Sequence, residues 1–222
     1  SQMHHGARAR HHIPANLNRT FAMKLLYAQP SPFARKVRVL AFELGLHEQL
    51  ELTPVAVLPT NENTEVTAHN PLGKIPVLLT DDGEALYDSR VICAYLQQLV
   101  SGSSPVASSA HWQQQTLIAM ADGVMEATLS IRYEQAIRPA DKQWPAWTDG
   151  QLEKIKRALA VLDSSNALGQ SEFTATQVGI GCALGYLDFR LPDLGWRSQF
   201  PALAAFYADF SQRPSMLTTQ PA

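Results

Sequence analysis

The sequence predicts an α/β domain followed by an all-α, helical-bundle domain. Apolar residues at strand and helix spacing alternate over residues 23–100, and the strand pattern nearly disappears beyond them. Between the two parts lies a stretch rich in serine and glycine, residues 101–110, which we interpret as a linker to a helical domain over 111–222. The chain has 222 residues, of which 45% are hydrophobic and 17% charged, so it has ample material for a buried core.

The charge balance and the apolar pattern exclude several classes of partner. A formal net charge of -2 offers no basic field for nucleic acid or for an anionic membrane surface. No apolar run reaches the ~18 to 20 residues of a membrane helix. Cys93 and Cys182 both stand among apolar residues, which is typical of reduced thiols. We therefore expect a soluble cytoplasmic protein that binds neither nucleic acid nor membranes.

Residues 1–22 differ from the rest of the chain. They contain arginine but no acidic residue, and they hold four of the 7 histidines. We expect this segment to be a leader or an added extension outside the folded domains. The remaining histidines lack acidic or cysteine partners at ligand spacing, so no metal site is expected.

The first half reads as strand, helix, strand, loop, hairpin and helix. An apolar run over residues 24–27 predicts a strand, and Pro32 suits the first position of the helix that follows. Gly45 supplies the end of that helix. A second strand is predicted over 50–57, then a loop with one helical turn over 60–70.

A hairpin and a capped helix complete the first domain. Residues 75–80 and 84–87 flank an Asp-Asp-Gly turn, so we expect two antiparallel strands. Asp88 and Ser89 then offer a cap for the next helix. In the second half, apolar residues at helical spacing predict helices near residues 117–128, 152–162 and 203–210. Thr174 and Gln177 have the spacing of a capping box that opens another helix.

Four segments together resemble the cytosolic glutathione transferase family. They are SPFARKVR after the first strand, NPLGKIPVL at the hairpin, YDSRVICAYL after it, and FTATQVGIGCALGYLDFR in the helical half. The resemblance runs from Met23 to about Pro214 and implies a thioredoxin-like N-terminal domain, residues 23–100, that binds glutathione. It also implies a homodimer and a glutathione transferase that joins the tripeptide to a small apolar electrophile.

The resemblance puts Ser31 in the position that activates the glutathione sulfur. Its hydroxyl could donate a hydrogen bond to the thiolate, and the adjacent helix N-terminus adds positive potential. Tyr27 on the first strand is the rival for this role, although an inward core tyrosine also explains it. A capping serine without any ligand is the structural alternative for Ser31.

The same resemblance implies the glutathione contacts. Ile75 would offer a backbone edge to the peptide ligand, held out by a cis Pro76, and Lys74 would meet the glycyl carboxylate. Ser89 would hold the γ-glutamyl carboxylate at a helix N-terminus, and Asp88 would accept from the ammonium. From local sequence, a solvated lysine and a simple cap explain these residues as well.

Other signals point to packing. The glycines from Gly179 to Gly185 lack the preceding strand of a dinucleotide-binding loop, so we interpret them as helix packing. Arg35, Lys36 and Arg38 are expected on a solvated helix face. The core is expected to hold most of a set of large side chains of the second half: Met120, Met125, Tyr133, Trp144 and Trp147. The resemblance implies that a subset of them lines the electrophile cleft between the domains, and for this subset we choose Met125 and Tyr133.

Two functions from different classes follow from the sequence. The first is a glutathione transferase with glutathione as co-substrate and no metal. Because no cysteine occupies the active-site position, a reductase that forms a mixed disulfide is disfavoured. The second is a catalytically silent, transferase-like interaction or regulatory module.

Overall fold

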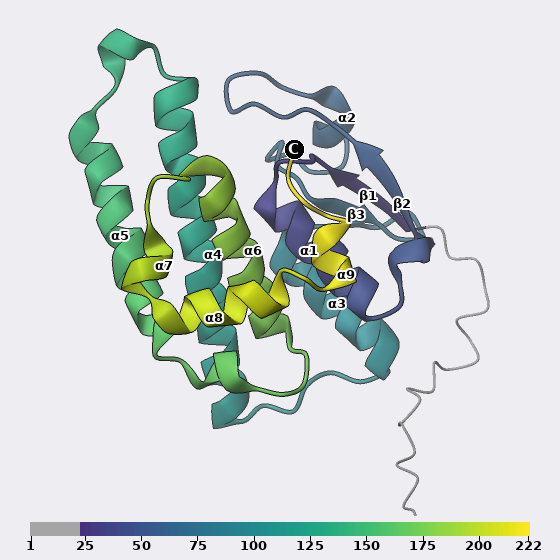
Figure 1. The fold of residues 1–222 in the computed structure, drawn as a ribbon. Helices are drawn as coiled ribbons and strands as arrows, with labels where there is room; N and C mark the ends of the chain where they lie inside the picture. The colour runs from purple at the N-terminus through teal and green to yellow at the C-terminus, as the bar shows by residue number, and fades with distance from the viewer. Residues whose placement is uncertain (1–22) are drawn as a thin grey trace, which may run out of the picture.

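The computed structural model describes residues 23–222, and it has the two predicted parts (Figure 1). The predicted leader, with its four histidines, lies outside the described residues. In chain order, with η marking a short 3-10 helix, the elements are β1 (Met23–Tyr27), α1 (Pro32–Glu43), η2 (His47–Gln49), β2 (Leu50–Pro54), α2 (Thr64–Thr67), β3 (Val77–Leu79), β4 (Ala85–Leu86), α3 (Ser89–Ser101), α4 (Ser109–Ala136), η3 (Ala140–Lys142), α5 (Pro145–Asp163), η4 (Asn166–Gly169), α6 (Ala175–Arg190), α7 (Trp196–Gln199), α8 (Pro201–Phe210) and α9 (Pro214–Leu217).

The strands of the first part form one mixed sheet in the order β2-β1-β3-β4. β2 runs parallel to β1, whereas β3 is antiparallel to both β1 and β4. This is the thioredoxin-like arrangement predicted from the sequence. The second strand is shorter than predicted and ends at Pro54, because its partner β1 ends opposite it at Tyr27.

Alternate side chains of the strands point to opposite faces of the sheet. Leu25 and Leu78 belong to the main core, which also contains buried residues of α1 and α3. Leu26 and Val77 point the other way and pack with Val66 of α2 in a second, smaller cluster. The sheet therefore has α1 and α3 on one face and α2 on the other.

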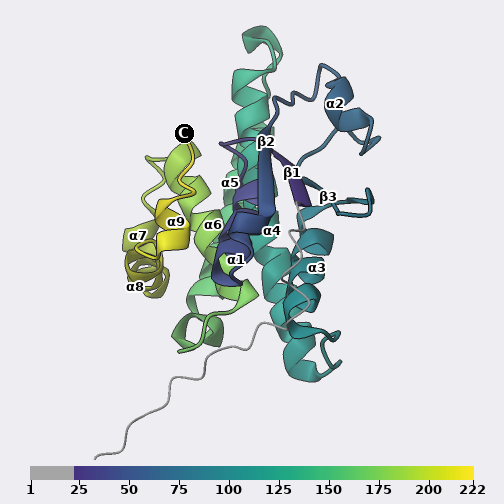
Figure 2. The same cartoon turned by 90° about the vertical axis from the view of Figure 1, so that its right-hand side faces the viewer.

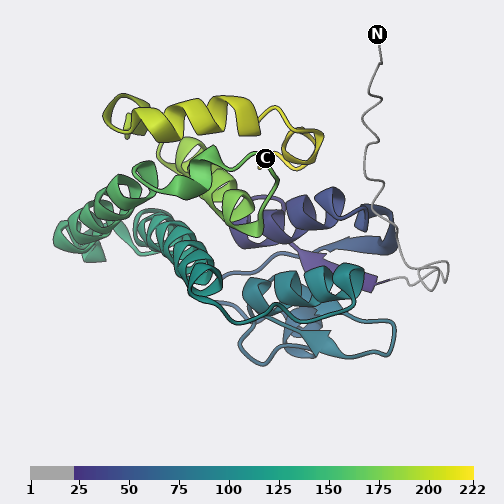
Figure 3. The same cartoon turned by 90° about the horizontal axis from the view of Figure 1, so that it is seen from below.

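The second part is entirely helical in the described residues, as predicted. α4 packs against both α5 and α6, and the view from below shows α4 and α5 side by side, away from the sheet (Figure 3). α6 is the central helix, and its glycines allow close packing. A Cβ on Gly181 would collide with the Phe210 ring, and one on Gly179 would lie 3.5 Å from Ala121. The helix-packing interpretation of these glycines is confirmed.

The expected capping box at the start of α6 is only half formed. The Thr174 side chain accepts a hydrogen bond from the Gln177 amide at 3.2 Å, as predicted. The Gln177 side chain does not reach back to Thr174. It donates instead to the carbonyls of Ala167 and Gln170, which ties the preceding loop to α6.

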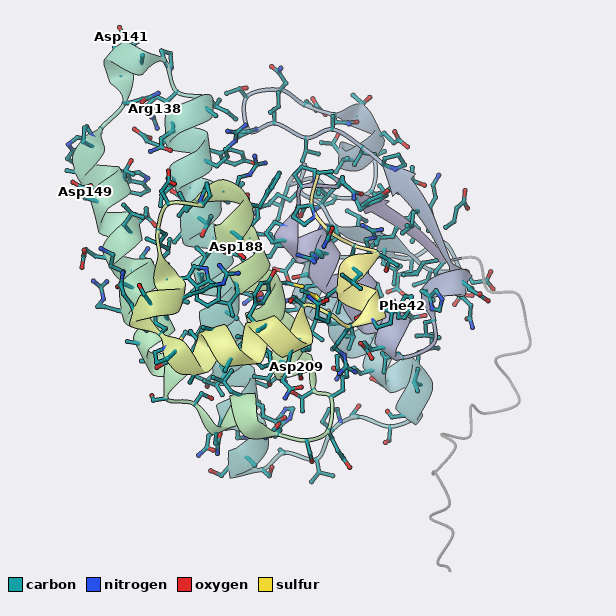
Figure 4. All side chains as sticks on the ribbon, in the orientation of Figure 1. Phe42, Arg138, Asp141, Asp149, Asp188 and Asp209 are labelled. Atoms are coloured by element: carbon teal, nitrogen blue, oxygen red, sulfur yellow. The ribbon has the colours of Figure 1, made fainter. Side chains whose placement is uncertain are left out.

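Two tryptophans predicted in the core, Trp144 and Trp147, lie instead at the tip that joins α4 to α5. Arg138 and Asp141 mark this tip, far from the centre of the molecule (Figure 4). Trp144 is 65% exposed and Trp147 46% exposed, so neither is a core residue. The Trp147 Nε1 atom donates to Ser130 Oγ at 3.0 Å, which holds the ring across the surface of α4.

The C-terminal segment returns to the first part. Turned by 90°, the molecule has α7, α8 and α9 on the side opposite α2 (Figure 2). Glu43 of α1 accepts from Arg213 at 2.7 Å and from Ser215 at 2.8 Å, which fastens α9 onto α1. Across residues 23–222, every helix is too short or too polar to serve as a membrane span.

Candidate glutathione site

Three segments meet at one end of the sheet. β1 and β3 are antiparallel with Leu26 opposite Val77, so the residues after β1 lie beside those before β3. β3 and β4 are also antiparallel with Leu78 opposite Leu86, which brings the residues after β4 to the same end. Residues 28–31, 74–76 and 87–89 therefore converge, although the sequence separates them widely.

Two helices begin at this end of the sheet. α1 begins directly after Ser31 and α3 directly after Asp88, and the two helices contact each other. A helix N-terminus has free amide hydrogens and a positive dipole end, so it favours anions. The local structure thus collects positive potential at the place where three chain segments meet.

Ser31 is the N-cap residue of α1. Its backbone is extended, with φ -73 and ψ 121, and its Oγ accepts a hydrogen bond from the Ala34 amide at 3.2 Å. A hydroxyl that accepts one bond still has its own proton to donate. Ser31 is half-buried, so it can cap the helix and donate to a ligand at the same time.

A narrow crevice adjoins Ser31. Its walls come from the start of α1, from α6 and from the C-terminal segment, and it is lined by Pro30, Ser31, Pro32, Arg35, Cys182, Tyr186 and Pro221. Gln29 Nε2 donates to the Gln220 carbonyl at 2.9 Å, which holds the C-terminal segment beside this crevice. Ser31 therefore lies where the first part of the chain meets the helical part.

The loop before β3 exposes a backbone edge. The Ile75–Pro76 peptide bond is cis, as the resemblance implied. Asn70 is buried and braces this loop, since its Nδ2 donates to the Lys74 carbonyl at 3.0 Å and its Oδ1 accepts from the Leu72 amide. Within residues 23–222, neither the amide nor the carbonyl of Ile75 makes a hydrogen bond. Both remain available to a peptide-like ligand.

Asp88 and Ser89 open α3. The Asp88 carboxylate accepts from the Arg90 amide at 3.0 Å and also pairs with the Arg90 guanidinium. Hydrogen bonds from Arg90 lower the pKa of the Asp88 carboxyl, although burial opposes them. Ser89 is 2% exposed, whereas the Asp88 side chain is 56% exposed. A ligand ammonium would have to share this carboxylate with Arg90.

Tyr27, the rival for the role of Ser31, is half-buried at the end of β1. The Arg38 guanidinium lies over its ring, 5.0 Å from the centroid. Burial lowers the pKa of Arg38 and Arg35 adds to this effect, while Tyr27 opposes it. A structural contact therefore occupies the face of the Tyr27 ring.

The comparisons with known proteins agree with this geometry. Residues 30–99 match the family model of the glutathione S-transferase N-terminal domain, and residues 145–209 match that of the C-terminal domain. The uncharacterised GST-like protein YibF of Escherichia coli (strain K12) is 34% identical over 204 residues, which cover 90% of this chain and 98% of that protein. The chain belongs to the glutathione S-transferase family.

Solved structures of the glutathione S-transferase family include similar chains. A family member from Pseudomonas fluorescens Pf-5 with bound glutathione is 46% identical, with a TM-score of 0.86 over 90% of this chain and 99% of that one. The same protein has also been crystallised with S-(propanoic acid)-glutathione. Elongation factor 1-gamma of Danio rerio is 26% identical over 87% of this chain, which spans 45% of that protein.

Two residues, Met125 and Tyr133, were predicted to line the electrophile cleft, and the structure contradicts the prediction for Met125. Met125 is 0% exposed in the main core, so it has no surface with which to meet a substrate, and the prediction for it is wrong. Helical spacing could not decide this, because α4 packs on two other helices and leaves little free surface at its centre. Tyr133, two turns further along α4, is half-buried.

The basic residues of α1 correct a second expectation. Arg35 is 5% exposed and Lys36 is 3% exposed, so they do not form a solvated face. Lys36 Nζ donates to Asp122 Oδ1 of α4, and Arg35 Nη2 donates to the Met216 carbonyl. The sequence did contain a sign of this burial. Arg35 lies four residues before Val39, and Lys36 lies four residues before Leu40, so each basic residue shares a helix face with a buried apolar one.

Proposed function

We propose that this chain is a glutathione transferase that binds reduced glutathione and activates its sulfur with Ser31. The observation that carries the proposal is the position of the Ser31 hydroxyl. It caps α1 as an acceptor, keeps its proton for a ligand, and adjoins a crevice between the sheet part and the helical part. The bound glutathione of the similar Pseudomonas protein supports the choice of ligand.

The other contacts follow from the chemistry of a tripeptide. The unpaired amide and carbonyl of Ile75 would pair with the cysteinyl portion, as in strand addition. The exposed Lys74 ammonium would meet the glycyl carboxylate. The γ-glutamyl carboxylate would approach the amide and hydroxyl of Ser89 at the start of α3. The ammonium of the same γ-glutamyl residue would donate to the exposed Asp88 carboxylate.

The energy required of Ser31 is modest. A free thiol titrates near ~8.5, and lowering its pKa by about two units requires roughly 2.7 kcal/mol of selective stabilisation of the thiolate. A hydrogen bond to a charged acceptor contributes about 1.5–3 kcal/mol, and a helix N-terminus about 0.3–1 kcal/mol more. Ser31 at the N-terminus of α1 combines both effects.

In the proposed reaction the thiolate adds to a small apolar electrophile held against the helical part, where Tyr133 would contribute to the cleft. The gain in rate comes from the larger thiolate fraction and from positioning. We further propose a cytoplasmic homodimer, as in the family that the sequence resembles.

The alternative is a transferase-like fold that serves as an interaction or regulatory module. The similarity to part of elongation factor 1-gamma favours it. Ser31, Lys74, Asp88 and Ser89 together argue for the enzyme, since a module that does not bind glutathione has no need of all four.

The test begins with glutathione binding by calorimetry. Binding in the range of cellular glutathione supports the enzyme, and no heat of binding at millimolar glutathione supports the module. The Ser31→Ala variant should then bind glutathione nearly as well but lose the ultraviolet absorbance of the bound thiolate. An undiminished thiolate signal would move the role to Tyr27.

Ser108→Ala is the matched control. Ser108 caps α4 in the way that Ser31 caps α1, accepting from the His111 amide at 3.1 Å. The variant loses a capping hydroxyl, worth about 0.5–2 kcal/mol of stability, far along the chain from the proposed sulfur position. It should keep the thiolate signal.

A further inference from the structure

The C-terminal ends of α4 and α6 lie at the same end of the molecule as the start of α1 (Figure 1). Tyr186 of α6 lines the crevice together with Ser31. One turn further along α6, the Arg190 guanidinium carbon lies 5.9 Å from the centroid of the Tyr186 ring. A continuous path of side chains thus leads from the Ser31 crevice to Arg190.

α4 adds two more side chains to this path. Burial raises the pKa of Tyr133, and Tyr186 adds to this effect while the charge of Arg190 opposes it. Burial likewise raises the pKa of Tyr186, although a side-chain hydrogen bond from Arg190 and the charges of Arg190 and Arg132 oppose it. Because α4 packs against α6, we group Arg132 and Tyr133 of α4 with Tyr186 and Arg190 of α6, and we call these four residues the rim.

The rim carries positive charge without an acidic partner among the described residues. Neither Arg132 nor Arg190 forms an ion pair within residues 23–222, whereas Arg90, Arg138, Arg197 and Arg213 each pair with a carboxylate. Asp188 lies on the same helix as Arg190 (Figure 4). Both terminal nitrogens of Arg197 donate to the Asp188 carboxylate. The nearest carboxylate in sequence is therefore already occupied.

Arg190 also has a buried donor that nothing satisfies. Its Nε atom is buried and has no hydrogen-bond partner in the described residues, while its guanidinium carbon lies 4.4 Å from the centroid of the Phe189 ring. The C-terminal dipole of α6 accounts for a cation in the last turn, but it supplies no acceptor for this atom. An unsatisfied buried donor is costly, so a ligand acceptor at this place would be favourable.

We propose that the electrophile carries a carboxylate, which Arg190 binds at the rim while its apolar body lies against Tyr133 and Tyr186. A guanidinium presents paired donors that match the two oxygens of a carboxylate. This inference rests on the proposed transferase function and refines its substrate class, from a wholly apolar electrophile to one with an apolar body and a carboxylate. Arg190 is then a residue that determines specificity, since it touches the substrate at a distance from the reacting sulfur.

Binding of glutathione conjugates tests the proposal without catalysis. S-(4-carboxybenzyl)glutathione and S-(4-carbamoylbenzyl)glutathione have nearly the same shape, differ in charge, and carry the carboxylate or amide on the far side of an apolar ring from the sulfur. Calorimetry should find the carboxylate conjugate bound about tenfold more tightly, which corresponds to about 1.4 kcal/mol. In Arg190→Gln this preference should disappear, while the affinity for glutathione itself stays unchanged.

Arg157→Gln is the matched control. Arg157 is exposed on α5 and forms no ion pair with the described residues, so the substitution removes the same charge away from the rim. It should keep the tenfold preference. Equal affinity of the wild-type protein for the two conjugates overturns the inference, and so does a preference that survives in Arg190→Gln.

The two proposals fail in distinguishable ways. If glutathione does not bind at all, the proposed function fails and this inference fails with it. If glutathione binds but Arg190→Gln weakens that binding, then Arg190 belongs to the glutathione site and the inference alone is overturned.

A kinetic comparison gives a second readout. With a chloronitrobenzoate and the corresponding chloronitrobenzamide, the thiolate forms a carbon–sulfur bond at the ring carbon and chloride leaves with the bonding electron pair. Relative to the uncatalysed rates, kcat/KM should favour the benzoate in the wild-type protein and in Arg157→Gln. The preference should be absent in Arg190→Gln, and its persistence there overturns the role of Arg190.

Discussion

Lys36 of α1 and Asp122 of α4 form an ion pair across the junction of the two parts, with a distance of 2.8 Å from Nζ to Oδ1. Their side chains are only 3% and 7% exposed. Burying two charges is unfavourable unless they are paired closely, so this contact determines how α1 can lie against α4. Because α1 also positions Ser31, the pair links the packing of the helical part to the proposed sulfur site.

Removing one partner of this pair should be more damaging than removing both. We expect Asp122→Leu to lower the free energy of unfolding by about 3–5 kcal/mol, because the Lys36 ammonium is left buried without a counter-charge. The double variant Lys36→Met with Asp122→Leu should recover most of that loss. Urea unfolding measures both, and a double variant no more stable than the single one would contradict a charge-based explanation.

Gly185 should tolerate no side chain. A Cβ there would lie 2.6 Å from Arg35 Nη1 and 3.0 Å from the Tyr207 hydroxyl. Arg35 cannot easily withdraw, because it donates to Thr219 at 3.2 Å and to the Met216 carbonyl at 2.9 Å. We expect Gly185→Ala to cost about 1–3 kcal/mol of stability in thermal or urea unfolding.

The control for this prediction lies on α5. A Cβ on Gly150 would meet nothing within 4 Å, and this residue is exposed. Gly150→Ala should therefore raise stability by about 0.5–1 kcal/mol, through its better helix propensity. If both alanine variants behave alike, the contact with Arg35 does not matter.

The two cysteines should be unreactive in the folded protein. Both are free and buried, and burial raises the pKa of Cys93 to about 12 and that of Cys182 to about 11. Since the thiolate is the nucleophile, neither should react with a disulfide reagent at about pH 8 until the protein unfolds. Rapid labelling of either thiol in the native state would contradict this, and would reopen a redox function.

Glu43 should make stability depend on pH in the acidic range. Burial alone would raise the pKa of its carboxyl, but hydrogen bonds from Arg213 and Ser215 outweigh burial and hold the pKa below its usual value. Because the folded-state pKa lies below the unfolded value of ~4.3, the ionised carboxylate stabilises the protein at pH values above about 4.3. This stabilisation is lost as the pH falls through the folded-state pKa. The stability difference between wild type and Glu43→Gln, from urea unfolding, should thus shrink below about pH 4. A difference that stays constant between neutral and acidic pH would exclude this contribution.

Local signals in the sequence predicted the secondary structure well. Asp88 and Thr174 were expected to cap helices, and a cap was the alternative to the catalytic role of Ser31. All three accept a hydrogen bond from an amide of the turn that follows. The Asp-Asp-Gly hairpin was also confirmed, with Gly83 at φ 82. Such features depend on residues within about one helical turn of each other, so a single stretch of sequence contains all that decides them.

The burial of individual side chains was decided by contacts between distant elements. Lys36 is buried because Asp122 lies 86 positions away in the chain but 2.8 Å away in space. Met125 was expected in a cleft and lies in the core, while Trp144 was expected in the core and is exposed. Spacing identifies the residues that share one face of a helix, but not what packs against that face.

By itself, the sequence determined the order of the elements, their caps, the hairpin and the family, because these depend on local chemistry and on motifs in a fixed order. Only the tertiary structure decided that three separate segments meet at the end of β1, that Ser31 adjoins Tyr186, and that Arg190 stands without an acidic partner among the described residues. The physical reason is that such contacts arise when the sheet and the helices pack together, and they involve residues on average far apart along the chain.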